Sequence, residues 1–242
     1  TNVPFETATN DGGLYTFPFL PVGNYTVSVE TTGFKKSVLG PFRLEVNQIA
    51  RVDVRLELGD ATQTVEITDV APILQTESTQ TGDSLNSNKL TSLPLNNRNF
   101  VSLTLLIPGA VSPNPEAMNS RFGARPYVNG NREQTNNFML DGVDVNDSID
   151  NRVGYSPNVD ALEEVRVLTG NAAAEFGAAG GATVMLQIKS GTNQFRGNVF
   201  NFLRNNKLDA NGFFRNRNLS TATRTGFKRN IFGGTLGGPI VK

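Results

Sequence analysis

Acidic residues recur at every third position in one short stretch of the 242-residue chain. They are Asp141, Asp144, Asp147 and Asp150. Counted from Asp144, oxygen-bearing side chains alternate as they do in a calcium-binding loop. However, Ile149 stands where that loop needs a glycine, and Tyr155 stands where it needs a bidentate acid. The spacing therefore favours a solvated acidic loop, and we predict no metal site.

The chain contains neither histidine nor cysteine. This excludes thiol nucleophiles, histidine general bases, disulfides and zinc sites with Cys or His ligands. The glycines between Gly177 and Gly181 match neither the dinucleotide-binding pattern nor the phosphate-loop pattern. We therefore predict no catalytic residue, no cofactor and no enzymatic activity. An enzyme with two carboxylates converging in a cleft is kept as an alternative.

The C-terminal part of the chain is basic. From Phe195 to Lys242, nine basic residues accompany a single acid, Asp209, so the remainder of this net-neutral chain is acidic. The same segment carries Phe200 and Phe202, and aromatic residues among basic ones also suit single-stranded nucleic acid. On a barrel strand, the mixture would form a lipid-facing aromatic girdle beside a loop near anionic headgroups. The alternating pattern and the zero net charge favour the barrel, and we expect no nucleic acid partner.

The elements that carry these residues begin with β-structure. Residues 14–19 alternate between apolar and polar side chains, and a Pro/Gly turn leads to a second alternating run at 25–29. Residues 51–58 repeat the pattern, and their inward side chains are expected to be Val52, Val54, Leu56 and Leu58. We predict a small antiparallel β-sandwich over residues 1–58.

The middle of the chain changes pattern after Leu93. Asn96, Asn97 or Asn99 is expected to cap a helix whose apolar face carries Phe100, Leu103 and Leu106, and Pro108-Gly109 should end it. A hairpin is expected next. Its strands would start at Tyr127 and Phe138, with a tight turn at Asp141-Gly142.

Residues 161–191 are expected to form a strand, a short helical turn and a second strand, and the residues between the two strands are mostly small. Val165 and Val167 should face one way, and Glu164, Arg166 and Leu168 the other. Asn171 is expected to cap the turn and Gly177 to end it. The alanines and glycines suggest backbone packed tightly against backbone, so the substitution Gly180→Leu is not expected to be tolerated. A strand near residues 196–206 and a glycine-rich partner near 229–242 follow.

Together these segments resemble a known family. The stretches "LPLNNRNFVSLTLLIPG", "YVNGNREQTNNFMLDGVDVND", "ALEEVRVLTGNAAAEFGAAGGATVMLQIKSGTNQFRGNVFNF" and "RNIFGGTLGGPI" resemble, in this order, the plug and first barrel strands of TonB-dependent outer-membrane receptors. "TATNDGGLYTFPFLPVGNYTVSVETTGFKK" resembles a carboxypeptidase-regulatory-like domain, a transthyretin-like sandwich. The resemblance covers essentially the whole chain.

The fold class that this resemblance implies is mainly β, with an α+β plug. A partial transthyretin-like or Ig-like sandwich, incomplete at its N-terminus, would span residues 1–58. A linker and plug would span 59–190, and the first hairpin of a truncated transmembrane β-barrel would span 191–242. The implied localisation is the cell outer membrane, with the plug and sandwich facing the barrel lumen and the periplasm.

The resemblance also implies a function, namely TonB-dependent import of an unidentified solute across the Gram-negative outer membrane. The implied partners are a TonB-like energy-coupling protein, outer-membrane lipid around the rest of the barrel, and the solute. A secreted or surface β-sandwich adhesin or carbohydrate-binding module is the alternative function. Plug loops would face the solute, with candidate residues Asn129, Asn131, Arg132, Asp141 and Asp144.

The family couples to TonB through a short exposed strand near the start of the plug, and strand addition relies on backbone groups. The segment that resembles it here is Thr64, Val65, Glu66, Ile67 and Thr68, followed by T-x-x-A-P. Two other interpretations of this segment are a plain linking strand and the last strand of the sandwich.

Overall fold

The structure is a computed structural model, and it describes residues 4–60, 64–67, 78–95, 98–112, 126–177, 180–210, 213–217 and 226–240. The chain falls into two compact units, one ending at Lys189 and the other beginning at Ser190. Both units are built mainly from strands, so the predicted fold class, mainly β with an α+β plug, is confirmed. Among the helices of the described segments, none is long and apolar enough to cross a membrane.

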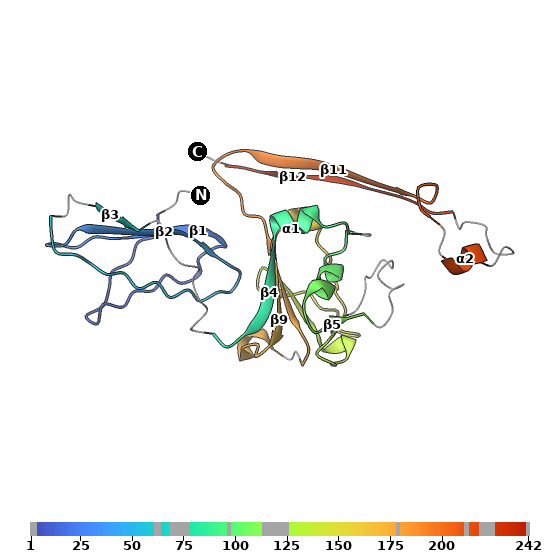
Figure 1. Ribbon diagram of the computed structural model, residues 1–242, viewed down its shortest axis with the longest axis horizontal. Helices are drawn as coiled ribbons and strands as arrows, with labels where there is room; N and C mark the ends of the chain where they lie inside the picture. The colour runs from blue at the N-terminus through green and yellow to red at the C-terminus, as the bar shows by residue number, and fades with distance from the viewer. Residues whose placement is uncertain are drawn as a thin grey trace. The chain divides into compact units, whose positions relative to one another are not determined.

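The N-terminal sheet has three strands in the order β1-β2-β3 (Figure 1). They are β1 (Gly23–Val29), β2 (Lys36–Leu44) and β3 (Thr64–Ile67). β1 and β2 are antiparallel, whereas β3 runs parallel to β2. β3 therefore forms one edge of this sheet, in agreement with the interpretation of residues 64–67 as the last strand of the sandwich.

Two of the strands expected in this region are absent from the sheet, which corrects the prediction. Residues 14–19 form no strand, and residues 51–58 contribute only an isolated bridge between Leu58 and Phe34. The alternation at 51–57 is nevertheless real, because exposed and half-buried side chains alternate along it. Leu58, expected to point inward, is 77% exposed. The end of this segment contacts the residues just before β2, where the Lys35 amide donates to the Glu57 carbonyl at 2.9 Å.

A five-stranded mixed sheet, in the order β4-β9-β10-β7-β8, forms the middle of the chain. Its strands are β4 (Thr81–Asn86), β7 (Asn137–Leu140), β8 (Val143–Asp144), β9 (Leu162–Gly170) and β10 (Thr183–Ile188). β9 has the two faces that its alternation predicts. Val165 and Val167 are fully buried in the main apolar core, and Leu168 belongs to a separate apolar cluster.

Short helices lie between the strands of this sheet. They are α1 (Ser87–Ser92) and the 3₁₀ helices η1 (Phe100–Leu106), η3 (Glu133–Thr135), η4 (Val159–Ala161) and η5 (Ala174–Phe176). The Asn99 side chain caps η1 by accepting from the Val101 amide, as one of the three predicted caps. Phe100 and Leu103 are fully buried, but Leu106 is 55% exposed, so its predicted place on the buried face is wrong. η1 ends at Leu106, and the next residue, Ile107, is again buried in the core.

A buried ion pair ties the approach to η1 to the start of β9. Arg98 donates to the Asp160 carboxylate at 2.6 Å, and both side chains are almost fully buried. The ammonium group of Lys189 donates to the Asp160 carbonyl at 2.8 Å. A buried charge is stable only when it is paired, so this contact fixes the two segments relative to each other.

The predicted hairpin starting at Tyr127 is wrong. β6 (Tyr127–Val128) pairs instead with β5 (Ala110–Val111), and β7 pairs with β10 and β8. The tight turn at Asp141-Gly142 does join two antiparallel strands, β7 and β8. Both turn residues have positive φ, +48° and +83°, as a type I′ hairpin turn requires.

The glycine patch has one crowded position, and it is not the predicted one. A Cβ at Gly180 would lie 3.8 Å from its nearest neighbour, an ordinary contact. A Cβ at Gly181 would lie only 2.5 Å from Oδ1 of the buried Asn136. The helical turn is η5, which Gly177 ends as predicted with a φ of +76°. Asn171 is not its cap, because the Asn171 amide group donates to the Thr79 carbonyl instead.

The C-terminal unit is a long antiparallel hairpin, in which β11 (Arg196–Asn205) and β12 (Lys228–Gly237) run side by side (Figure 1). A short helix, α2 (Phe213–Arg217), lies in the connection. The register puts Phe200 and Phe202 on the same face as Arg204, whereas Val199 and Leu203 lie on the opposite face. Both faces of the hairpin therefore carry apolar side chains, and Phe232 and Leu236 of β12 share the face of Val199 and Leu203.

Candidate functional site

The candidate coupling segment coincides with β3. Its four residues pair in register with the first half of β2, from Lys36 opposite Thr64 to Leu39 opposite Ile67. Thr64 is exposed and Val65 half-buried, while Thr68 lies outside the described residues. Because β3 is an edge strand, one row of its backbone groups is used by β2 and the other row faces away from the sheet. An edge of this kind is what strand addition requires.

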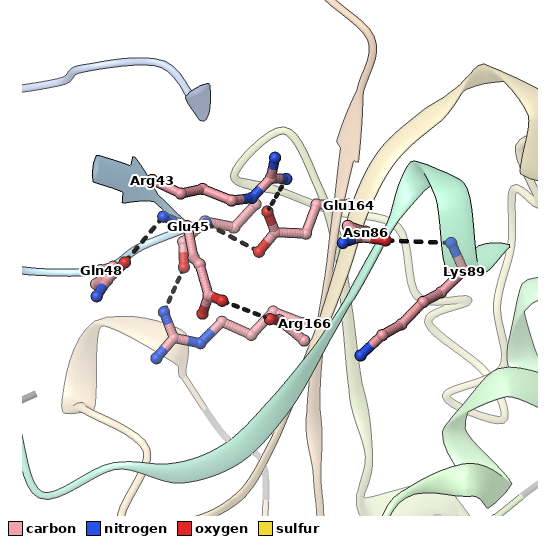
Figure 2. A network of polar contacts seen from close by, with 9 residues as sticks. Arg43, Glu45, Gln48, Asn86, Lys89, Glu164 and Arg166 are labelled. Carbon is pink, nitrogen blue, oxygen red and sulfur yellow. Dashed lines mark hydrogen bonds and ion pairs between the residues drawn. The ribbon is translucent and has the colours of Figure 1, made fainter. Parts of the chain in front are cut away.

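The opposite end of β2 contacts the plug sheet through a group of polar side chains (Figure 2). We call this group the β2–β9 contact, and it comprises Arg43, Glu45, Val46, Ser84, Glu164 and Arg166. The Glu164 carboxylate accepts from the Val46 amide at 3.2 Å and from the Arg43 guanidinium at 3.3 Å. The Arg166 guanidinium donates to the Val46 carbonyl at 2.5 Å. Both backbone groups of Val46 are therefore held by β9 side chains.

A third connection reaches the neighbouring strand of the plug. The Ser84 hydroxyl on β4 donates to the Glu45 carboxylate at 2.9 Å, and the Glu45 amide donates to the Gln48 side chain at 2.9 Å. Ser84 lies opposite Arg166 in the β4–β9 ladder. The segment after β2 is thus fixed to two adjacent strands of the same sheet.

Burial shifts the titration of both charged groups on β9. Desolvation raises the pKa of the Glu164 carboxyl, and the Val46 amide and the Arg43 guanidinium partly oppose that rise. Desolvation also lowers the pKa of the Arg166 guanidinium, opposed by the nearby Glu45 and Glu164 carboxylates. Both charges are costly to bury, and their partners on residues 43–46 offset part of that cost.

An apolar cluster lies next to the polar contact. Its buried members are Val46 from the sandwich and Leu168, Phe176 and Met185 from the plug. Val22 and Met139 pack against it from the two parts of the chain. Because apolar burial contributes in proportion to the area removed from water, the polar contact is reinforced by ordinary packing.

Two of the predicted solute-facing residues hold the backbone of the plug. The Asn129 amide group donates to the Thr169 carbonyl at 2.6 Å. The Asp141 carboxylate accepts from the Ile188 amide at 3.0 Å. Asp141 itself has a positive φ and lies in the turn between β7 and β8. These contacts give Asn129 and Asp141 structural roles at the ends of β9 and β10.

The other three predicted residues lie further out. Arg132 is exposed at the start of η3, and Asn131 is half-buried two residues after the positive-φ Asn129. Asp144 is exposed and lines an open hollow of about 380 Å³ together with Asp147, Asp150 and neighbouring polar residues. The structure thus brings three of the four regularly spaced acids to one hollow. Within the described segments, no group of three or more acidic side chains is arranged to hold a metal ion.

Asparagine side chains position these loops, a role that the sequence reasoning missed. Asn136 is buried, donates to the Pro126 carbonyl at 2.7 Å and accepts from the Ala182 amide at 2.9 Å. Asn151 donates to the Asn136 carbonyl at 2.8 Å, and Asn146 accepts from the Phe138 amide at 3.1 Å. Side-chain amides therefore replace ladder hydrogen bonds between irregular segments. The signal in the sequence is that asparagine is its most frequent residue.

Three family models match the chain in a fixed order. A carboxypeptidase regulatory-like domain matches residues 1–57, a TonB-dependent receptor plug domain matches residues 58–184, and an outer-membrane β-barrel domain matches residues 187–242. The plug model alone covers more than half of the chain. The chain belongs to the TonB-dependent receptor family.

One curated relative and several solved structures are similar to the chain. The chain is 29% identical over 249 residues to the TonB-dependent transporter Oar of Myxococcus xanthus, covering 98% of this chain and 22% of that protein. It therefore spans about a fifth of the length of this curated relative. Among solved structures, it resembles the siderophore receptor PirA of Acinetobacter baumannii, with 21% identity, 66% and 22% of the two chains covered and a TM-score of 0.49. It also resembles the outer membrane transporter YddB of Escherichia coli, with 17% identity, 52% and 18% covered and a TM-score of 0.44.

Family membership fixes two general properties. The family consists of receptors and transporters and is not enzymatic, which argues against the paired-carboxylate alternative. Its plug and barrel domains place the protein in the outer membrane, as the sequence predicted.

Proposed function

We propose that this chain supplies the plug and the periplasmic sandwich of a TonB-dependent importer, which moves a solute across the Gram-negative outer membrane. The three-part division into sandwich (1–58), linker and plug (59–190) and first barrel strands (191–242) is part of this proposal. The observation that carries it is the plug match over residues 58–184, placed between a sandwich and a barrel match.

The proposed coupling segment is Thr64–Thr68. It is supported by the edge position of β3, whose outer backbone groups face away from β2 and are suited to pairing with an extended strand of a TonB-like protein. The proposed solute contacts come from Asn131, Arg132 and Asp144, with Asn129 and Asp141 holding the loops that carry them. Outer-membrane lipid would surround the barrel to which β11 and β12 belong.

Binding of the isolated periplasmic domain of the host TonB to the full-length, detergent-solubilised receptor tests the coupling role. Val65→Pro removes a backbone N–H from β3 and is expected to weaken binding at least about tenfold, because strand addition depends on backbone hydrogen bonds. Val65→Thr keeps the backbone and the β-branched side chain, so it is expected to bind like the wild type. Equal affinities for the wild type and the proline variant would refute the coupling role.

A further inference from the structure

β2 is attached at both of its ends to parts of the chain that matter for coupling. Its first half pairs with β3, and the residues at and after its end form the β2–β9 contact with the plug. We infer that β2 carries load from β3 to the plug, so that the sandwich and the plug sheet respond to a pull as one body. The identity of β3 as the pulled strand rests on the proposed function, but the connection through β2 does not.

The β3 end of this connection does not need to open when a partner binds. β2 occupies one edge of β3 through four registered pairs, and the other edge is outside the sheet. A strand added there would extend the order β1-β2-β3 by one strand and leave the β2–β3 pairing intact. A pull on the added strand would then act on the whole sandwich sheet rather than on a loose segment.

The plug end of the connection is a buried, mutually dependent set of contacts. Glu164 and Arg166 hold the amide and the carbonyl of the same residue, Val46. Arg43 supplies the opposite charge to Glu164, whose side chain is about 1% exposed. Removing one partner leaves another charge buried without compensation, so the set is expected to separate cooperatively rather than bond by bond.

The covalent route from β3 to the plug is the chain between Ile67 and Thr81. The chain from Ile67 to Thr81 can extend to about 46–50 Å, from the maximum reach of a polypeptide. It transmits tension only after β3 has moved by the difference between that reach and its resting span. The route through β2 consists of a paired strand and a packed contact, which have no such slack. The β2–β9 contact is therefore loaded before the linker becomes taut.

Single-molecule pulling on the full-length receptor in a lipid bilayer tests this order of events. A cysteine introduced by Thr64→Cys, at an exposed position of β3, attaches β3 directly to the probe in a receptor from which any cysteine outside these 242 residues has been replaced. TonB is not needed in this experiment. The measured quantity is the extension at which the plug first resists the pull.

Two variants weaken the β2–β9 contact. Arg43→Gln removes a side chain that is 38% exposed, so folding should survive, and Glu164→Gln removes the buried charge while keeping an acceptor for the Val46 amide. In both variants the first resistance of the plug is expected at a longer extension, at most the one at which the chain from Ile67 to Thr81 reaches its limit of about 46–50 Å. The matched control is Arg51→Gln, which should behave as the wild type. Arg51 is exposed and pairs with Asp53, another exposed residue of the sandwich.

The possible outcomes separate this inference from the proposed function. If both contact variants resist at the wild-type extension, or if the wild type itself resists only once the linker is taut, β2 carries no load and the inference is wrong. That result would leave TonB binding through β3 intact. Conversely, a later resistance in the contact variants combined with unchanged TonB binding by Val65→Pro would support the load path and refute the choice of coupling strand.

Discussion

Gly181→Ala is expected to loosen the plug, whereas the same change one residue earlier should not. The new Cβ at position 181 would lie 2.5 Å from Asn136 Oδ1 and 2.8 Å from the Thr135 hydroxyl oxygen. Neither glycine has a left-handed φ, so backbone strain is not the difference between the two sites. The difference is that position 181 touches a buried asparagine whose hydrogen bonds hold two segments together.

The size of the effect follows from those hydrogen bonds. Moving Asn136 away would cost its bond from the Ala182 amide and strain its bond to the Pro126 carbonyl. Each buried group left without a partner costs about 1–3 kcal/mol, and the reduced freedom of the unfolded chain returns about 0.4–1 kcal/mol. We therefore expect a local destabilisation of about 2–4 kcal/mol.

Hydrogen exchange of the full-length receptor, followed by mass spectrometry, measures this local stability. Peptides covering β10 and its start should lose protection roughly 30- to 700-fold in Gly181→Ala, because about 1.4 kcal/mol corresponds to a factor of ten. Gly180→Ala should keep wild-type protection or gain slightly, since its nearest neighbour would be 3.8 Å away. Equal protection in the two variants would refute the crowding at Gly181.

The buried ion pair and the buried acid give two further predictions. Asp160→Asn should destabilise the plug by about 3–5 kcal/mol, because the buried charge of Arg98 would lose the Asp160 carboxylate. Asp53→Asn, in an exposed pair, should cost less than about 1 kcal/mol. Unfolding of the full-length receptor in denaturant checks both, and similar losses in the two variants would contradict this difference. The pKa of Glu164 is raised in the folded state. The resulting contribution to stability is fully present below the ordinary pKa of a glutamate, and it is lost as the pH rises through the raised pKa. The thermal midpoint of the wild type should therefore fall relative to Glu164→Gln over this pH range, and parallel pH profiles would show that Glu164 is not desolvated.

The parts of the fold that follow from local periodicity were predictable. The two faces of β9 and the turn at Asp141-Gly142 depend on neighbouring residues alone, and both are present in the structure. β2 was missed because its alternation is interrupted. The ladder shifts register between Tyr25 and Val27, opposite the stretch of β2 that contains Gly40-Pro41, and proline within a strand normally marks such an irregularity.

Non-local pairing explains the remaining errors. We predicted that the strand at Tyr127 pairs with the strand after it because the two are close along the chain, but β6 pairs with β5. In the same way, alternation placed Glu164 and Arg166 on one face of β9 but could not identify Val46, more than a hundred residues away, as their partner. An asparagine side chain can both donate and accept hydrogen bonds, but its presence in the sequence does not indicate which distant segment it will bind.

The proposed coupling requires β3 to contact a TonB-like protein in the cell. A photo-crosslinking amino acid placed at the exposed Thr64 position of the full-length receptor, in energised cells, tests this contact. The matched position is Ser28, also exposed, on β1 at the other edge of the same sheet. If β3 is the coupling strand, position 64 crosslinks to the TonB-like protein and position 28 does not. Crosslinks from both positions alike, or from neither, would contradict it.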